Sequence, residues 1–185
     1  MFNTLSYIGK KLNDADITWG VGASILLNRF GLIDKPNDID IFVSINDIEK
    51  TDEILKSIGE KKKWEKTTTY STKYLYEYVI NKVDVDVMAG FVVNHNNGAF
   101  RYIFDKSSIS EYKVINEVKI PFTSLEDWYV IYQLIPNRKA KVEMIEKYIV
   151  SNGIKKSILL ERALQGCLPI DVRRKVEDIL NQYKN

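Results

Sequence analysis

The chain has 185 residues, of which 45% are hydrophobic and 28% are charged, enough for one sizeable buried core. Its 27 lysines and arginines nearly balance its 25 aspartates and glutamates, which argues against a protein that coats nucleic acids by neutralising phosphates. A single cysteine and a single histidine exclude disulfide frameworks and Cys/His zinc sites within one chain. Carboxylates, hydroxyl groups, cations and the backbone must therefore carry most of any chemistry.

The first third of the chain alternates between helical and strand patterns. Leu5, Ile8 and Leu12 recur at helical spacing. Gly31 is typical of the end of a helix, and Asn46 is suited to capping the start of another. The pattern predicts a helix over the first dozen residues, a strand at 17–21, a helix at 25–30, a strand at 38–43 and a helix at 47–58.

In the middle of the chain the period changes to two, and β-branched and aromatic residues dominate. Asn81-Lys82 and Asn96-Asn97-Gly98 have the composition of hairpin turns. This block predicts a mostly antiparallel sheet with strands at 64–69, 73–80, 83–88, 91–93, 99–104 and 118–122.

The last third of the chain is helical. Thr123 and Glu126 have the spacing of a capping box, and the apolar stripe that follows them runs to Pro136. Further helices are predicted at 138–150, 155–164 and 170–183. The fold class is therefore α+β, a mixed and mostly antiparallel sheet with flanking helices, divided into an α/β core at 1–122 and a C-terminal helical region at 123–185.

Aspartates occur at alternate positions on two of the predicted strands, as Asp38 and Asp40 on one and as Asp84 and Asp86 on the other. Alternate residues of a strand share one face, and aspartate is disfavoured in strands, so the pattern is unusual for a solvated surface. Carboxylates on one face repel one another unless a cation neutralises them, and Mg²⁺ takes such oxygen ligands together with substrate phosphates. A metal held in this way suits phosphoryl or nucleotidyl transfer.

The order of these motifs resembles the nucleotidyltransferase superfamily with the DNA polymerase β-like fold, especially its small antibiotic-modifying members and related bacterial proteins. The resemblance is carried by Trp19-Gly20-Val21-Gly22-Ala23-Ser24, a following helix, Asp38-Ile39-Asp40-Ile41, and Val85-Asp86-Val87-Met88 on a later strand. It covers roughly residues 15 to 150. Ala23 departs from the family pattern, in which glycine or serine is common at this position.

The resemblance implies that Asp38 and Asp40 bind the metal that bridges the nucleotide phosphates. Asp86 would complete a second metal site and help to deprotonate the acceptor hydroxyl, with Asp84 as its rival. We expect two Mg²⁺ ions and ATP, or another NTP, as the substrate.

The resemblance also implies residues that bind the nucleotide. Gly22 would let the backbone approach the triphosphate, and Ser24 would donate a hydrogen bond to it near a helix N-terminus. Lys141, followed by Arg138, is the first choice for a phosphate contact from the helical region. The alternative for both cations is a solvated helix start.

The predicted activity is transfer of NMP, AMP from ATP in the first instance, to a hydroxyl group of an unidentified acceptor with release of pyrophosphate. Two alternatives remain open, a toxin-type enzyme that acts on RNA or protein and a catalytically silent nucleotide-binding or interaction module. The N-terminal sequence lacks a signal-peptide pattern, and no apolar run approaches the ~18 residues of a membrane span. We therefore expect a cytoplasmic monomer or homodimer that contacts neither membranes nor nucleic acids in general.

Overall fold

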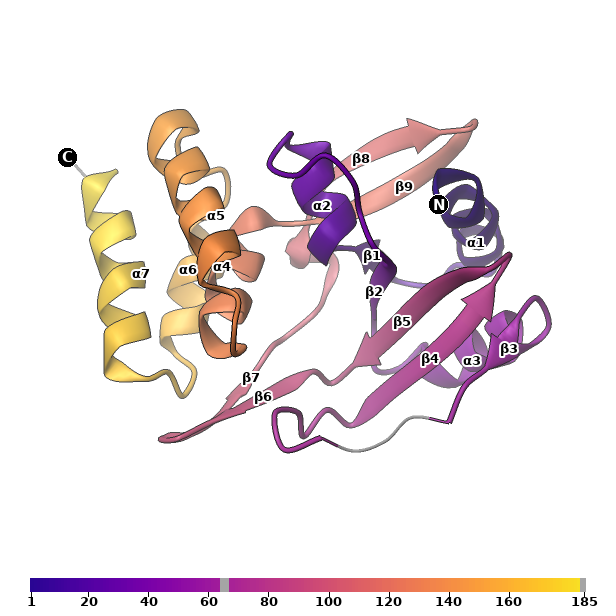
Figure 1. Ribbon diagram of the computed structural model, residues 1–185, viewed down its shortest axis with the longest axis horizontal. Helices are drawn as coiled ribbons and strands as arrows, with labels where there is room; N and C mark the ends of the chain where they lie inside the picture. Colours follow the sequence, from indigo (N-terminus) through magenta and orange to yellow (C-terminus); the bar gives the residue numbers. More distant parts are fainter. Residues whose placement is uncertain (64–66, 184–185) are drawn as a thin grey trace.

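A computed structural model of the chain describes residues 1–63 and 67–183 (Figure 1). Its helices are α1 (Phe2–Asp14), α2 (Ala23–Arg29), α3 (Ile48–Lys56), α4 (Leu125–Leu134), α5 (Lys139–Asn152), α6 (Ser157–Leu164) and α7 (Ile170–Gln182), with a short 3₁₀ helix, η1 (Lys106–Ser108). Its strands are β1 (Trp19–Val21), β2 (Ile39–Val43), β3 (Glu60–Lys61), β4 (Tyr74–Ile80), β5 (Val83–Ala89), β6 (Val92–His95), β7 (Gly98–Arg101), β8 (Ile109–Ile115) and β9 (Val118–Thr123).

Within the described residues, seven strands form one mixed sheet in the order β3-β4-β5-β2-β1-β9-β8, and β6 pairs with β7 in a separate ribbon. Most neighbours are antiparallel, as the sequence predicts. The two exceptions are the parallel pairs β2–β5 and β1–β9. The parallel β2–β5 pair matters for function because both strands carry the alternating aspartates. The predicted α+β class, a mostly antiparallel sheet with flanking helices, is confirmed.

The two predicted hairpin turns are present. Asn81 and Lys82 join β4 to β5 with positive φ angles of 50° and 64°, the conformation that a two-residue turn between antiparallel strands requires. The β6–β7 hairpin closes between His95 and Gly98. Gly31 follows α2 with a φ of 68°, as expected for a glycine after a helix.

Several local predictions are wrong in detail. Ser124, rather than Thr123, caps α4, because its hydroxyl oxygen accepts the backbone N–H of Asp127 while Thr123 ends β9. Asn46 does not cap α3, whose N-cap is Asp47. Strands β8 and β3 were not predicted. The predicted strand at 64–69 lies partly outside the described residues, and its described part, 67–69, is not a strand.

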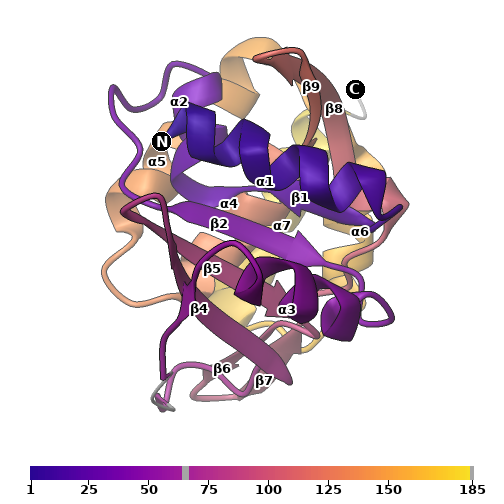
Figure 2. The same ribbon diagram turned by 90° about the vertical axis from the view of Figure 1, so that its right-hand side faces the viewer.

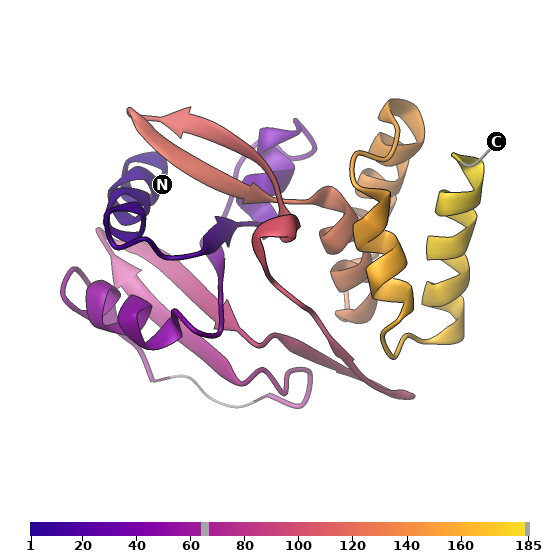
Figure 3. The ribbon, with the colours of Figure 1, turned by 180° about the vertical axis from the view of Figure 1, so that it is seen from behind.

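Helices lie on both sides of the sheet. Helices α1 and α3 contact each other and cover one face, as Figure 2 shows. The C-terminal helices α4 to α7 stack together at one end of the molecule, with α4 closest to the strands (Figure 3). Among the described residues, no helix combines the length and the apolar character that crossing a bilayer requires.

An aromatic cluster joins the helical region to the sheet. The ring of Phe42 on β2 lies 5.5 Å from that of Trp128 on α4 and 4.8 Å from that of Tyr102. Phe91 and Phe104 also contact Phe42, with ring centroids 5.3 and 5.9 Å away. One continuous group of buried side chains therefore includes both predicted parts of the chain, and the division at residues 122 and 123 stays a prediction.

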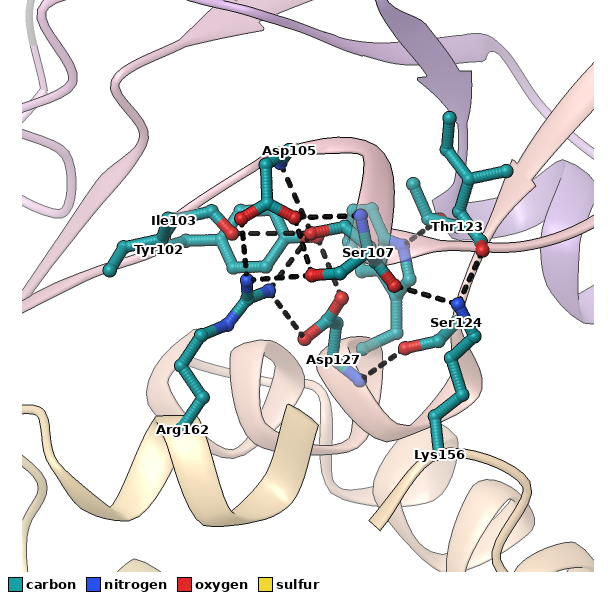
Figure 4. Close-up of polar contacts among 12 residues, drawn as sticks. Tyr102, Ile103, Asp105, Ser107, Thr123, Ser124, Asp127, Lys156 and Arg162 are labelled. Atoms are coloured by element: carbon teal, nitrogen blue, oxygen red, sulfur yellow. Dashed lines mark hydrogen bonds and ion pairs between the residues drawn. The ribbon is translucent and has the colours of Figure 1, made fainter. Parts of the chain in front are cut away.

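A polar network ties the segment before β8 to the helical region (Figure 4). Asp127 on α4 is only 5% exposed and accepts a hydrogen bond of 2.8 Å from the hydroxyl of Tyr102. Arg162 on α6 pairs with Asp105 at 3.0 Å and lies 4.0 Å from Asp127. Lys156 donates to the carbonyl of Ser107 at 2.7 Å. A cavity of about 390 Å³ adjoins this network, and none of the alternating aspartates lines it.

The buried Asp127 carboxyl makes stability depend on pH. Burial raises its pKa from 3.8 to about 7, so between these pH values the folded protein holds a proton that the unfolded chain has lost. Wild-type stability should fall as the pH rises through this window. We expect Asp127→Asn, which cannot ionise, to gain stability relative to wild type between pH 5 and pH 8 in urea unfolding.

Asp105→Asn is the matched control for this prediction. Hydrogen bonds from Ser107 and the charge of Arg162 lower the pKa of Asp105, although burial opposes them. Its carboxylate therefore stabilises the folded state above its unfolded pKa, and the substitution should cost stability at pH 8. A stability difference between Asp127→Asn and wild type that does not change with pH would contradict a buried, proton-binding Asp127.

Candidate active site

Three half-buried aspartates meet on one face of the parallel β2–β5 pair. Asp40 on β2 stands in register with Asp86 on β5, and Asp38 immediately precedes β2 on the same face. One carboxylate oxygen from each lies within 4.8 Å of the others. Parallel pairing is the reason, because it places both acidic strand segments at the same edge of the sheet. We call Asp38, Asp40 and Asp86 the acidic triad.

The electrostatics of the triad favour a bound cation. Burial, followed by the negative charges of Asp38 and Asp86, raises the pKa of Asp40 well above its usual value. Burial and the charges of Glu77 and Asp38 raise the pKa of Asp86 to about 6. Carboxylates held this close are destabilised as anions, and a divalent cation with oxygen ligands relieves their repulsion.

The structure separates the two candidates for the third carboxylate. Asp84 lies two residues before Asp86 on the same strand face but is exposed and pairs with Lys62 at 2.6 Å. Asp86, in contrast, joins Asp38 and Asp40. On the other side of Asp86, Glu77 of β4 stands in register with it. The geometry therefore favours Asp86, as the resemblance implies.

Gly22 and Ser24 lie at the β1–α2 junction, beside the triad. The backbone N–H of Gly22 donates to the carbonyl of Asp40 at 3.0 Å. The hydroxyl of Ser24 lies 3.2 Å from Oδ1 of Asp38, to which it donates, so Ser24 orients one member of the triad. Ala23 between them has a φ of 45°, a left-handed conformation that favours glycine. The phosphate contacts implied for Gly22 and Ser24 stay predictions.

Gly22 has a second role that the sequence does not reveal. A Cβ added to it would lie 2.4 Å from Nε1 of Trp128, a distance at which atoms overlap. The indole is held there because its Nε1 donates to the hydroxyl of Thr123 at 2.9 Å, and this hydroxyl donates to the carbonyl of Val21 at 3.1 Å. Glycine at this position therefore allows Trp128 of α4 to pack against the β1–α2 junction.

The helical region brings cations to the triad. The positive charge of Lys141 on α5 acts to lower the pKa of Asp40, and burial followed by the charge of Arg138 lowers the pKa of Lys141 itself. Lys141 Nζ lies 3.5 Å from the hydroxyl of Tyr132. Arg138 is the N-cap residue of α5 and is exposed. Lys141 acts on Asp40, and Arg138 acts on Lys141, Tyr132 and Tyr70. The contacts of both cations with phosphate stay predictions.

Sequence reasoning did not assign Tyr132 to the site. Burial raises the pKa of its hydroxyl, and the charge of Asp40 raises it further. Tyr70 is placed similarly, because burial raises its pKa, the charge of Arg138 lowers it, and the charges of Asp40 and Asp86 raise it further. Tyr132 belongs to the apolar stripe of α4, so no sequence signal separates it from core residues.

Solved structures with a similar fold include nucleotidyltransferases of small molecules. TM1012 of Thermotoga maritima, which is assigned as a nucleotidyltransferase, is 21% identical, with 81% of this chain and 92% of that chain covered and a TM-score of 0.58. ANT(2")-Ia in complex with adenylyl-2"-tobramycin is 14% identical, with 96% of this chain and 97% of that chain covered and a TM-score of 0.58. The lincosamide antibiotic adenylyltransferase LnuA, bound to lincomycin, is 15% identical, with 78% of this chain and 95% of that chain covered and a TM-score of 0.52. At these identities, the similarity shows the fold.

No curated protein matches the sequence significantly. A family model does match, over residues 1–166, and its family is described as nucleotidyl transferase of unknown function (DUF2204). The matched residues include the whole triad, the β1–α2 junction, Lys141 on α5 and Arg138 at the N-cap of α5. The chain belongs to this nucleotidyl transferase family, and the protein is a nucleotidyltransferase.

Proposed function

We propose that the protein transfers an NMP group, AMP from ATP, to a hydroxyl group of a small-molecule acceptor, with Mg²⁺ bound by Asp38, Asp40 and Asp86. The observation that carries this proposal is the meeting of three carboxylate oxygens within 4.8 Å of one another. Hard oxygen ligands at this spacing, with raised pKa values at Asp40 and Asp86, fit Mg²⁺. When bound, the ion neutralises phosphate charge and favours ionisation of a hydroxyl that it contacts.

The residues around the triad divide the site between two substrates. Lys141 and Arg138 lie on the side of the helical region, where their charges suit the triphosphate. On the β4–β5 side, Asp86 stands in register with Glu77, and the cation that acts on its carboxylate there is Lys62. We therefore place the nucleotide toward α5 and the acceptor toward β4.

The reaction is a substitution at the α-phosphorus. The acceptor oxygen forms a bond to this phosphorus, the bond between the α-phosphorus and the bridging oxygen breaks, and pyrophosphate leaves with that electron pair. The acceptor proton passes to the carboxylate of Asp86, which lies on the side of the triad next to Glu77 of β4. Lys141 and Arg138 hold the triphosphate while this occurs.

The fold supports a small-molecule acceptor over RNA or protein. The similarity to this chain covers most of the length of ANT(2")-Ia and of LnuA. The first was solved with adenylyl-2"-tobramycin, and the second, a lincosamide antibiotic adenylyltransferase, with lincomycin. A chain with a net charge of +2 offers no strong overall field for either class. The acceptor itself is to be found by screening.

Pyrophosphate release tests the proposed function. The full chain is incubated with each NTP, Mg²⁺ and a panel of hydroxyl-bearing antibiotics, RNA and protein acceptors. We expect release with ATP, Mg²⁺ and one class of small molecule, and no release when EDTA removes the metal. Transfer to RNA or protein instead would contradict the small-molecule proposal, and equal release in EDTA would contradict metal dependence.

A further inference from the structure

A second cavity lies beyond the cations of the site. It has a volume of about 210 Å³ and is bounded by α4, α5 and the start of α7, with apolar walls that include Ile135 and Val142. Tyr132 and Arg138 line it as well. Tyr132 also adjoins Lys141, whose Nζ lies 3.5 Å from its hydroxyl, and burial and the charge of Asp40 raise the pKa of Tyr132. The charge of Arg138 acts on Lys141. The cavity therefore shares Tyr132 and Arg138 with the predicted triphosphate position.

Gln133 brings an unsatisfied polar group to this cavity. Its side chain lines the cavity, and its Nε2 donates to the carbonyl of Tyr129 at 3.2 Å, which orients the amide. Its Oε1 is shielded from solvent and has no hydrogen-bond partner among residues 1–63 and 67–183. A buried acceptor without a partner costs stability, and native proteins rarely retain one without a reason. A ligand with an N–H group would satisfy it.

We propose that this cavity binds the nucleobase and that the Gln133 amide selects adenine, an inference that rests on the proposed nucleotidyl transfer. The amide retains one free N–H and the Oε1 acceptor. Adenine offers the complementary pair, an N6 amino donor beside the N7 acceptor. Guanine presents two acceptors, O6 and N7, at the same edge and leaves Oε1 without a partner.

The path from the triad to Gln133 is continuous. Tyr132 precedes Gln133 on α4, so the residue beside Asp40 and the residue at the cavity are neighbours in the chain. The terminal torsion of a glutamine is soft, so the Gln133 amide can turn toward a ligand in the cavity and exchange its bond to the Tyr129 carbonyl for bonds to that ligand. Ile135 and Val142 supply the apolar contacts that a planar base requires.

Calorimetric titration of the full chain tests the assignment without catalysis. The ligands are the α,β-methylene analogues of ATP, GTP, CTP and UTP with Mg²⁺, since their α–β linkage cannot break. We expect wild type to bind the ATP analogue about ten-fold more tightly than the GTP analogue, the discrimination of one bidentate pair. Gln133→Met, which keeps the length of the side chain, should lose this preference.

Gln133→Glu provides a second variant with a different expected result. Its carboxylate only accepts, so it suits the N1–H and N2–H donors of guanine and should reverse the preference toward the GTP analogue. Gln182→Met is the matched control, because Gln182 is exposed at the opposite end of α7 from the cavity. It should bind all four analogues as wild type does.

The outcomes separate the inference from the function on which it rests. If wild type binds no analogue, both the proposed function and the adenine site are wrong. If wild type binds the analogues but Gln133→Met and Gln133→Glu keep the wild-type order of affinities, the function stands and the adenine site is wrong. If the Gln133 variants bind all four analogues more weakly than wild type by the same factor, Gln133 has a structural role only, and the adenine site is likewise wrong.

Discussion

Asp40→Asn is expected to reduce kcat/KM for nucleotidyl transfer about a thousand-fold, since a bound metal contributes several kcal/mol to such a transition state. Asp40 is central because it stands in register with Asp86 and its carboxylate lies close to that of Asp38. An amide in its place removes one anionic ligand while keeping the shape of the side chain. The measurement is pyrophosphate release at saturating Mg²⁺.

The same substitution should not weaken the fold. Burial and the charges of Asp38 and Asp86 raise the pKa of Asp40, so its ionised form destabilises the metal-free protein at neutral pH. Asp40→Asn removes this repulsion. In urea unfolding with EDTA present, its free energy of unfolding should therefore equal or exceed that of wild type. Addition of Mg²⁺ should stabilise wild type and leave the variant almost unchanged.

Asp84→Asn is the matched control for Asp40→Asn. It removes a carboxylate two residues from Asp86 on the same strand face, but this carboxylate is exposed and paired with Lys62. Surface substitutions of this kind change free energies by about 0.5 kcal/mol or less, so activity should stay within about two-fold of wild type. Full activity in Asp40→Asn, or its loss in Asp84→Asn alone, would refute the proposed metal site.

Gly22→Ala is expected to cost about 3 kcal/mol of unfolding free energy, at the upper end for an overpacked core. The added Cβ would lie 2.4 Å from Nε1 of Trp128, and the indole cannot move without losing its hydrogen bond to Thr123. Because the backbone of Gly22 also bonds to Asp40, activity should fall with stability. Urea unfolding and pyrophosphate release measure the two effects.

Two variants show whether the steric contact is the cause. Gly31→Ala places a Cβ in open space at a φ of 68°, so it carries only the conformational cost of about 1 kcal/mol. Combining Gly22→Ala with Trp128→Phe should restore part of the lost stability, because the smaller ring leaves room for the methyl group. If the double variant is as unstable as the sum of the single variants, the indole is not the obstacle.

Patterns within short segments could be predicted from the sequence. The β4–β5 hairpin follows from Asn81-Lys82, because two residues with positive φ join antiparallel strands, and both adopt it. The start of α7 follows from Pro169. Strand β8 was missed because its alternation is inverted, with Tyr112 exposed and Glu111 on the half-buried side, where it pairs with Arg29 at 3.1 Å.

The sequence by itself determined the fold class and the chemical character of the site, since alternate aspartates must share a strand face whatever surrounds them. Only the tertiary structure decided which of them lie together. The parallel register of β2 and β5 places Asp86 beside Asp40, whereas Lys62 pairs with Asp84. Register is a long-range property, set by the packing of the whole sheet rather than by either strand.

The roles of Gly22 and Gln133 depended on tertiary packing even more strongly. Gly22 must lack a side chain because a tryptophan more than 100 residues later packs against it, and the sequence gives no distance between them. The proposed role of Gln133 rests on its Oε1, which lacks a partner within the described part of the chain, beside a cavity that three helices form. Local residue preferences act over a few neighbours, whereas steric fit and unsatisfied hydrogen bonds exist only after distant segments have packed together.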